Sequence, residues 1–182
     1  NKMGQVDIKT GRNYINLYII KTLLKRFLDQ ADPINMLVGI EKKLATSVNT
    51  TTGNININGS IDRAAKNSDG FRIIDYKTGN VRSLNFSWNP DKGDEALFER
   101  LRKTPQILQL LVYYLLWTAV SGNDENEPVS LGVFSFRSMK TSLLKINGKT
   151  SFSYDRTAAL IRDIMRRISN HILTPDHDFS QT

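Results

Sequence analysis

The sequence of 182 residues contains no cysteine, which excludes disulfide bonds and thiolate metal sites within this chain. An iron–sulfur cluster, which needs cysteine ligands, cannot be held by these residues either. A chain without cysteine is compatible with a reducing compartment, and we therefore expect a cytoplasmic protein.

The sequence also has no apolar run long enough to cross a bilayer, and its first residues show no signal-peptide pattern. The longest apolar stretch, residues 107–120, is interrupted by Gln109 and is typical of a buried helix. We expect no membrane partner. The length fits one domain over residues 1–182, and the start at Asn1 and the end at Thr182 suggest a piece excised from a longer protein.

Negative charge is scarce relative to positive charge: 25 lysines and arginines face 18 acidic residues, a net charge of +7. This excess favours a polyanionic partner, although plain solubility is an alternative explanation. Histidine is scarce as well, with only His171 and His177 near the end of the chain.

Periodicity and turn residues predict an α/β protein in which a central mixed β-sheet is flanked by helices. Short connections predict an antiparallel meander of the first three strands. We expect helices over 11–31, 95–103, 104–120 and 155–173, and strands over 36–48, 53–62, 71–77, 129–136, 142–146 and 151–154, the last two joined at Asn147-Gly148.

Two further segments carry residues that suit nucleic acid. In the polar loop of residues 80–94, Phe86 and Trp88 suit stacking on bases, although we favour a role in pinning the loop to the body. On the last helix, a stripe of arginines could follow phosphates, but we favour a solvated helix face. These arginines are Arg156, Arg162, Arg166 and Arg167.

The stretch from Gly59 to Gly79 carries the residues most suited to chemistry. Asp62 ends one strand, and Asp75 and Lys77 lie two positions apart on the next, so their side chains point to the same face. Carboxylate oxygens suit Mg²⁺, and a lysine beside them could position water or stabilise charge on phosphate. The alternative is that these residues are ordinary solvent-exposed side chains without a function. However, Asp75 follows an apolar run, where an unpaired carboxylate is costly.

Two other elements add candidate residues. On the helix over 104–120, Gln106, Gln109 and Tyr113 share one face, and a glutamine on an apolar helix needs hydrogen-bond partners. Capping a sheet edge is the alternative role for Gln109. On the strand over 36–48, Glu41 is a candidate acidic residue, with a solvated strand face as the alternative.

Three motifs in order resemble the nuclease domain of the RecB/AddB branch of the PD-(D/E)XK superfamily: Gly59-x-x-Asp62-Arg63, Ile73-Ile74-Asp75-Tyr76-Lys77-Thr78-Gly79 and Gln109-x-x-x-Tyr113. The resemblance is close over residues 40–113 and extends to the rest by layout. It implies a restriction-endonuclease-like core and a metal-dependent deoxyribonuclease that acts in DNA repair and recombination beside a helicase domain or subunit. An exonuclease is favoured over an endonuclease.

The resemblance also implies the roles of individual residues. Asp62, Asp75, the backbone carbonyl of Tyr76 and Glu41 would bind Mg²⁺, for which Mn²⁺ can substitute. Lys77 would orient water or stabilise the phosphate. Gln109 and Tyr113 would orient the lysine or contact the DNA backbone.

The sequence departs from this family at one place, because the helix over 11–31 lacks the histidine that often joins the metal site. A nuclease-like fold that only binds DNA or another protein is therefore a rival hypothesis. Retention of both aspartates and the lysine favours activity. A third reading is an unrelated domain in which the acidic and basic residues are surface decoration.

Overall fold

The computed structural model describes residues 11–29, 36–51, 53–89, 91, 93–120 and 127–173. Along the chain its elements are α1 (Gly11–Asp29), β1 (Met36–Thr50), β2 (Gly53–Asn67), β3 (Gly70–Lys77), β4 (Asn85–Phe86), α2 (Asp94–Lys103), α3 (Pro105–Val120), β5 (Val129–Ser135), β6 (Lys140–Leu143), β7 (Lys145–Ile146), β8 (Ser151–Phe152) and α4 (Tyr154–Leu173). None of the described helices is both long enough and apolar enough to span a membrane.

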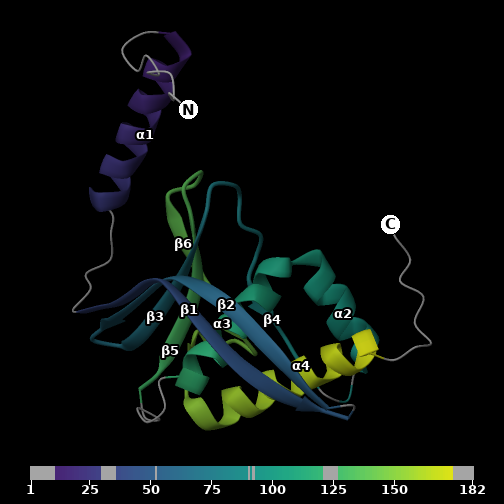
Figure 1. Ribbon diagram of the computed structural model, residues 1–182. Helices are drawn as coiled ribbons and strands as arrows, with labels where there is room; N and C mark the ends of the chain where they lie inside the picture. The colour runs from purple at the N-terminus through teal and green to yellow at the C-terminus, as the bar shows by residue number, and fades with distance from the viewer. Residues whose placement is uncertain are drawn as a thin grey trace, which may run out of the picture.

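A six-stranded mixed sheet forms the centre of the fold, in the order β1-β2-β3-β5-β6, with β8 pairing with β5 (Figure 1). The antiparallel meander of β1, β2 and β3 confirms the prediction from the short connections. β3 pairs in parallel with β5, and the connection between them contains α2 and α3. A parallel pair requires such a crossover, so β3 becomes a central strand with neighbours on both sides.

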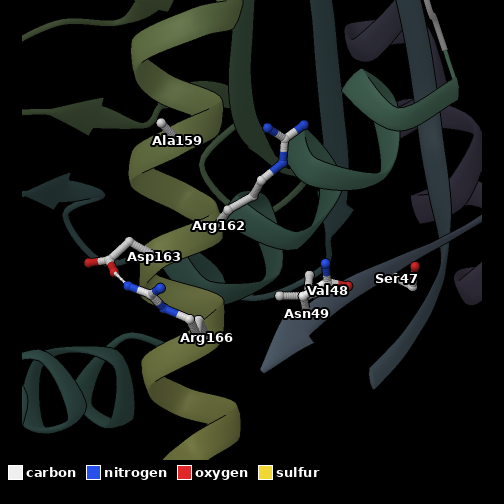
Figure 2. Close-up of a pocket in the computed structure, with 7 residues that line it drawn as sticks. All are labelled: Ser47, Val48, Asn49, Ala159, Arg162, Asp163 and Arg166. Atoms are coloured by element: carbon white, nitrogen blue, oxygen red, sulfur yellow. Dashed lines mark hydrogen bonds and ion pairs between the residues drawn. The ribbon is translucent and has the colours of Figure 1, made fainter. Parts of the chain in front are cut away.

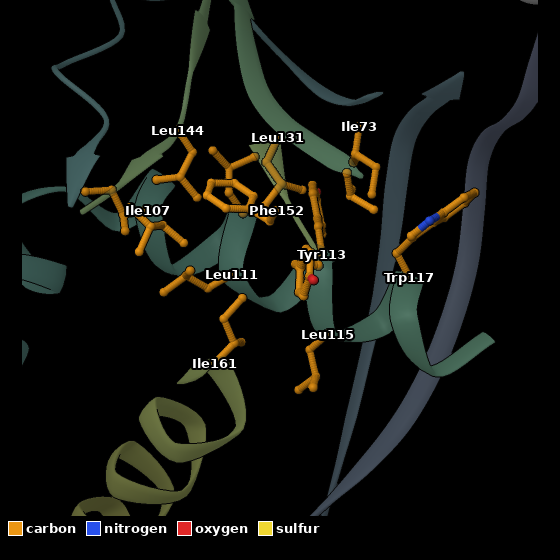
Figure 3. Close-up of a cluster of buried hydrophobic side chains, with 14 of the residues drawn as sticks. Ile73, Ile107, Leu111, Tyr113, Leu115, Trp117, Leu131, Leu144, Phe152 and Ile161 are labelled. Carbon is orange, nitrogen blue, oxygen red and sulfur yellow. The ribbon is translucent and has the colours of Figure 1, made fainter. Parts of the chain in front are cut away.

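α3 packs against β1, β2 and β5, and α4 packs against α3 and β1, so the two helices cover one face of the sheet. Figure 3 shows side chains of α3, α4 and the strands meeting in the core between them. Ile73 of β3, Leu111 of α3 and Ile161 of α4 are completely buried there. The helix predicted from the apolar run of residues 107–120 is thus confirmed as a buried helix.

The glycine of the Gly59-x-x-Asp62-Arg63 motif has a packing reason. A Cβ atom at Gly59 would lie 2.7 Å from Cδ1 of Leu116 on α3, closer than van der Waals contact allows. Glycine therefore lets α3 approach β2 closely. This approach brings the next residues of β2 and the polar face of α3 into the same region.

α1 confirms the first predicted helix up to Asp29, and residues 30 and 31 lie outside the described part of the chain. Its apolar residues, however, do not form a buried face: Tyr18 and Leu28 are 65% and 70% exposed. α1 stands away from the sheet in Figure 1, and its Phe27 contacts aromatic residues of the body near the end of the helix.

The predicted loop of residues 80–94 contains the short strand β4, which pairs in parallel with β7. Phe86 and Trp88 are buried, so the role of pinning the loop is confirmed, and their rings are not available for stacking on bases. Asn147 holds the same loop, accepting a hydrogen bond from the Trp88 amide at 3.0 Å.

The predicted hairpin around Asn147-Gly148 is correct at its turn but wrong for its strands. Both turn residues have positive φ, and the flanking Ile146 and Lys149 exchange backbone hydrogen bonds. β7 then pairs with β4 and β8 pairs with β5, so the two strands diverge. Local turn chemistry determines the turn, whereas strand partners depend on which edges the rest of the fold leaves open.

Candidate active site

Asp75 lies near the end of β3 on the face covered by α3, and only 1% of its surface is exposed. It follows Ile73 and Ile74, which are both buried. A carboxylate in such surroundings is unfavourable unless other groups compensate its charge.

Three side chains supply that compensation. Lys77 Nζ lies 3.0 Å from Asp75 Oδ2 and 3.3 Å from Oδ1. From α3, Gln109 Nε2 donates a hydrogen bond to Asp75 Oδ1 at 2.8 Å, and the Tyr113 hydroxyl donates to the same oxygen at 3.3 Å. Gln109 Nε2 also lies 2.8 Å from the Tyr113 hydroxyl, so the three groups form one network.

Helix geometry explains why Gln109 and Tyr113 act together. Residues four apart lie one above the other on the same face of a helix, and α3 turns this face toward β3. The predicted alternative, that Gln109 only caps a sheet edge, does not fit its bond to a buried carboxylate. The third residue predicted for this face, Gln106, is partly buried one turn earlier.

Asp62 lies where β2 and β3 separate. Their antiparallel ladder ends at the pair Arg63 and Ile74, so Asp62 and Asp75 are the next residues on the two strands. Asp62 Oδ2 accepts a hydrogen bond from the Tyr76 amide at 2.8 Å, just beyond the last ladder pair. The side chain of Asp62 thereby holds the peptide between Asp75 and Tyr76.

Burial and the neighbouring charges shift the pKa values of Asp75 and Tyr113. Burial raises the pKa of the Asp75 carboxyl, the hydrogen bond and charge of Lys77 oppose the rise, and the charge of Asp62 adds to it. Burial also raises the pKa of Tyr113 to about 12, and the carboxylates of Asp75 and Asp62 contribute. Tyr113 is therefore a neutral hydrogen-bond donor at any physiological pH.

One atom of the network lacks a hydrogen bond. Asp75 Oδ2 is buried and accepts none within the described part of the chain, although the Lys77 ammonium is near. A buried carboxylate oxygen in this state, with the second carboxylate of Asp62 on the adjoining strand, fits a divalent cation that prefers oxygen ligands.

Glu41 lies between the ladder pairs Ile40–Arg63 and Lys42–Ile61, and so across from Asp62 in the register of β1 and β2. It is exposed on β1, with a positive φ of 47°. The described residues contain no group of three histidine, cysteine, aspartate or glutamate side chains that could hold a metal ion. The participation of Glu41 and of the Tyr76 carbonyl therefore stays a prediction.

Histidine is likewise not part of the described site. His171 lies in the last turn of α4, where its ring contacts Phe98 with centroids 4.3 Å apart. The other histidine, His177, lies outside the described residues. The helix that could have supplied a histidine, α1, contacts the opposite face of β3.

The aromatic cluster on the opposite face of β3 was not predicted from the sequence. The Tyr76 ring lies on the face away from α3, where it contacts Phe134 and Phe136 of the β5 region and Phe27 of α1. The Arg63 guanidinium lies 5.8 Å from the centre of the Tyr76 ring. The signal was present in the alternation of β3, because the residue between Asp75 and Lys77 must point to the other face.

Comparison with protein families identifies the chain. The model of the PD-(D/E)XK nuclease superfamily matches residues 6–181, and the chain therefore belongs to this superfamily. The fold agrees, since a central mixed sheet flanked by helices is the architecture expected of a restriction-endonuclease-like core.

Other comparisons add little. A search of curated proteins gives no match. A solved protein described as SSO0001 is similar at 14% sequence identity and a TM-score of 0.37, over 92% of this chain and 61% of that protein. The chain thus spans less than two thirds of that protein, and a likeness this low carries no functional argument.

Proposed function

We propose that this chain is a metal-dependent nuclease that hydrolyses phosphodiester bonds of DNA. The observation that carries the proposal is the buried Asp75, whose Oδ2 lacks a hydrogen bond while Lys77 and the adjoining Asp62 lie beside it. In a member of the PD-(D/E)XK nuclease superfamily, this pair of carboxylates with a lysine is suited to phosphate chemistry.

The residues have distinct proposed roles. Asp62 and Asp75 would hold Mg²⁺ or Mn²⁺, with the Tyr76 carbonyl and Glu41 as further candidate ligands. Such an ion supplies Lewis-acid polarisation of the phosphoryl group and a more acidic water. The Lys77 side chain is 38% exposed, so its ammonium can reach a phosphate oxygen or orient the attacking water.

Gln109 and Tyr113 are proposed as positioning residues. Both donate to Asp75 Oδ1, whereas Oδ2 accepts no hydrogen bond from the described residues and has the Lys77 ammonium 3.0 Å away. Holding Oδ1 in this way fixes the rotation of the carboxyl group. Residues that orient a ligating carboxylate commonly change activity or metal affinity 10–100-fold when removed.

We further propose that the chain belongs to the RecB/AddB branch and works with a helicase domain or subunit in DNA repair and recombination in the cytoplasm. The three motifs in order support this branch. An exonuclease is favoured, and a comparison of linear with covalently closed circular DNA measures this, because an exonuclease degrades only the linear form. Stimulation of degradation by ATP in the full-length protein would support the helicase.

The rival proposal, a nuclease-like fold that binds DNA without cleaving it, is favoured by one observation. Among the described residues, no third histidine, aspartate or glutamate completes a group with Asp62 and Asp75 that could hold a metal ion. Binding of labelled DNA by the wild-type protein without any cleavage in Mg²⁺ or Mn²⁺ would support this rival.

Two substitutions test the proposed function. Asp75→Asn removes a charge without changing shape, and Lys77→Ala removes the ammonium. Lys77→Ala is expected to lower cleavage of a linear DNA about 10²–10³-fold, the usual contribution of a group that stabilises developing charge. Asp75→Asn is expected to lower it by about a thousandfold or more, because it also removes a proposed metal ligand. Circular dichroism should show an unchanged fold.

Asp69→Asn is the matched control, because Asp69 is exposed in the turn between β2 and β3. It should cleave DNA at the wild-type rate. Undiminished metal-dependent cleavage by either Asp75→Asn or Lys77→Ala would refute the assignment of the active site.

A further inference from the structure

A hollow on the surface lies between α4 and the second half of β1, apart from the candidate active site. Its volume is about 350 Å³. Figure 2 shows the side chains of α4 along one wall and those of β1 along the other. The lining residues are Ser47, Val48, Asn49, Ala159, Arg162, Asp163 and Arg166.

The arginines of this hollow are not equivalent. Arg166 pairs with Asp163 at 2.6 Å, and Asp163 is also bound by Arg167 at 2.8 Å. Arg167 in turn pairs with Asp94 of α2 at 2.6 Å. The one carboxylate of the hollow is therefore already shared between two guanidinium groups.

Arg162, by contrast, has no ion-pair or hydrogen-bond partner within the described part of the chain. Figure 2 shows its side chain extended away from the pair of Asp163 and Arg166. Across the hollow, the hydroxyl of Ser47 and the amide of Asn49 supply polar groups that can donate hydrogen bonds. A guanidinium without a carboxylate partner, in a hollow that is also lined by neutral donors, is suited to an anion.

The chemistry of these groups favours phosphate in particular. A guanidinium presents a planar fork of N–H donors that matches two oxygens of a phosphate, and such charge-assisted bonds are about twice as strong as neutral ones. The net charge of +7 attracts a polyanion to the protein as a whole. Arg162 and Arg166 are exposed, which confirms the solvated helix face expected from the sequence. Ser47 and Asn49 are exposed as well, so a ligand can reach the hollow from solvent.

We propose that this hollow binds one phosphate of a DNA strand at a distance from the bond that is cleaved. Val48 pairs with Ile55, and Asp62 comes seven positions after Ile55 on β2. At roughly 3.3 Å per residue, the hollow lies up to about 23 Å along the strand from the carboxylates. That length corresponds to about seven nucleotides at 3.4 Å per nucleotide.

That the bound strand is the substrate depends on the proposed nuclease function, whereas the affinity for phosphate does not. Binding is therefore measured in the presence of a chelator, so that no cleavage takes place. The probes are a fluorescein-labelled single-stranded 20-mer, followed by fluorescence anisotropy from 50 to 300 mM salt, and inorganic phosphate, followed by its effect on Tm.

Arg162→Ala is expected to raise the Kd of the 20-mer about five- to twentyfold. The slope of log K against log salt should become shallower by about 0.7, the value for one phosphate contact with a single strand. Arg162→Lys should recover part of the affinity. The matched control is Arg102→Ala, which removes the same charge from an exposed position of α2 and should change the Kd less than twofold.

The outcomes distinguish binding of free inorganic phosphate from binding of a phosphate in a DNA strand. If inorganic phosphate raises the Tm of the wild type but not of Arg162→Ala, while both bind the 20-mer equally, the hollow takes free phosphate and the strand path is wrong. If Arg162→Ala matches the wild type with both probes, or if Arg102→Ala weakens DNA binding as much, the proposal is overturned. A protein that binds DNA through Arg162 but never cleaves it would retain this proposal and lose the proposed function.

Discussion

The two faces of β3 have opposite character: one holds a buried polar network and the other a cluster of aromatic rings. Asp75 points to the face under α3, where a lysine, a glutamine and a tyrosine surround its carboxylate. Tyr76 points to the other face, where it contacts rings from α1 and the β5 region. Alternation along a strand separates these two environments within a single residue step.

The difference shows how a costly polar site is supported. The polar face is covered by α3, which is firmly buried, and its hydrogen-bond donors come from one side of that helix. The aromatic face is covered only in part, because most large apolar residues of α1 are exposed. We infer that rigidity at the site comes from α3, and that α1 contributes through the single ring of Phe27.

Among the substitutions that compare the two faces of β3, Gln109→Leu on the polar face is expected to have the largest effect. Gln109→Leu keeps the volume but removes the donor to Asp75 Oδ1, so the carboxylate loses its shortest hydrogen bond. Metal-dependent cleavage should fall about 10–100-fold, measured as kcat on a linear DNA.

Gln106→Leu is the matched control, because it changes the same residue type one helical turn earlier. It should lower kcat less than threefold. An equal loss in both variants would show that the polarity of α3, and not the contact with Asp75, matters.

A smaller effect is expected from the ionisation of Tyr113, whose pKa is raised to about 12 from an ordinary value near 10. The folded protein keeps this proton at a pH at which the unfolded chain has lost it. Stability therefore falls as pH rises from about 10 to 12, by up to about 2 kcal/mol.

Urea unfolding of the wild type and of Tyr113→Phe between pH 9 and 11.5 measures this decrease. The variant should lose less stability with rising pH, and its absorbance titration at 295 nm should lack one late-titrating tyrosine. A tyrosine titration identical to that of the wild type would contradict the assignment.

The smallest effect is expected from a substitution on the aromatic face, measured as a change in Tm. Phe27→Ala removes the ring that contacts Tyr76, Phe134 and Phe136, but the partly exposed ring contributes little to the main core. The Tm should fall by only a few degrees, in line with about 1 kcal/mol or less.

Limited proteolysis sharpens this test, because α1 of Phe27→Ala should be cut about tenfold faster than in the wild type. Leu28→Ala is the control, since Leu28 is 70% exposed. Equal rates of cutting in the two variants would show that Phe27 does not attach α1 to the body.

Much of this arrangement could be predicted from the sequence. Turn residues and short connections predicted the meander, and the apolar run of residues 107–120 predicted α3, because these signals are local. The predictions were wrong for features that depend on contacts between residues far apart in the sequence. The diverging strands after residue 144 and the exposed face of α1 both depend on surfaces that distant parts of the chain leave open or occupied.

The sequence by itself determined which residues of β3 share a face, since a strand alternates whatever surrounds it, and it placed Gln109 and Tyr113 on one side of a helix. Only the tertiary structure decided that this side of α3 meets Asp75 and that Asp62 holds the Tyr76 amide. The physical reason is that a buried carboxylate requires donors, and which donors reach it depends on how helix and sheet pack, not on spacing along the chain.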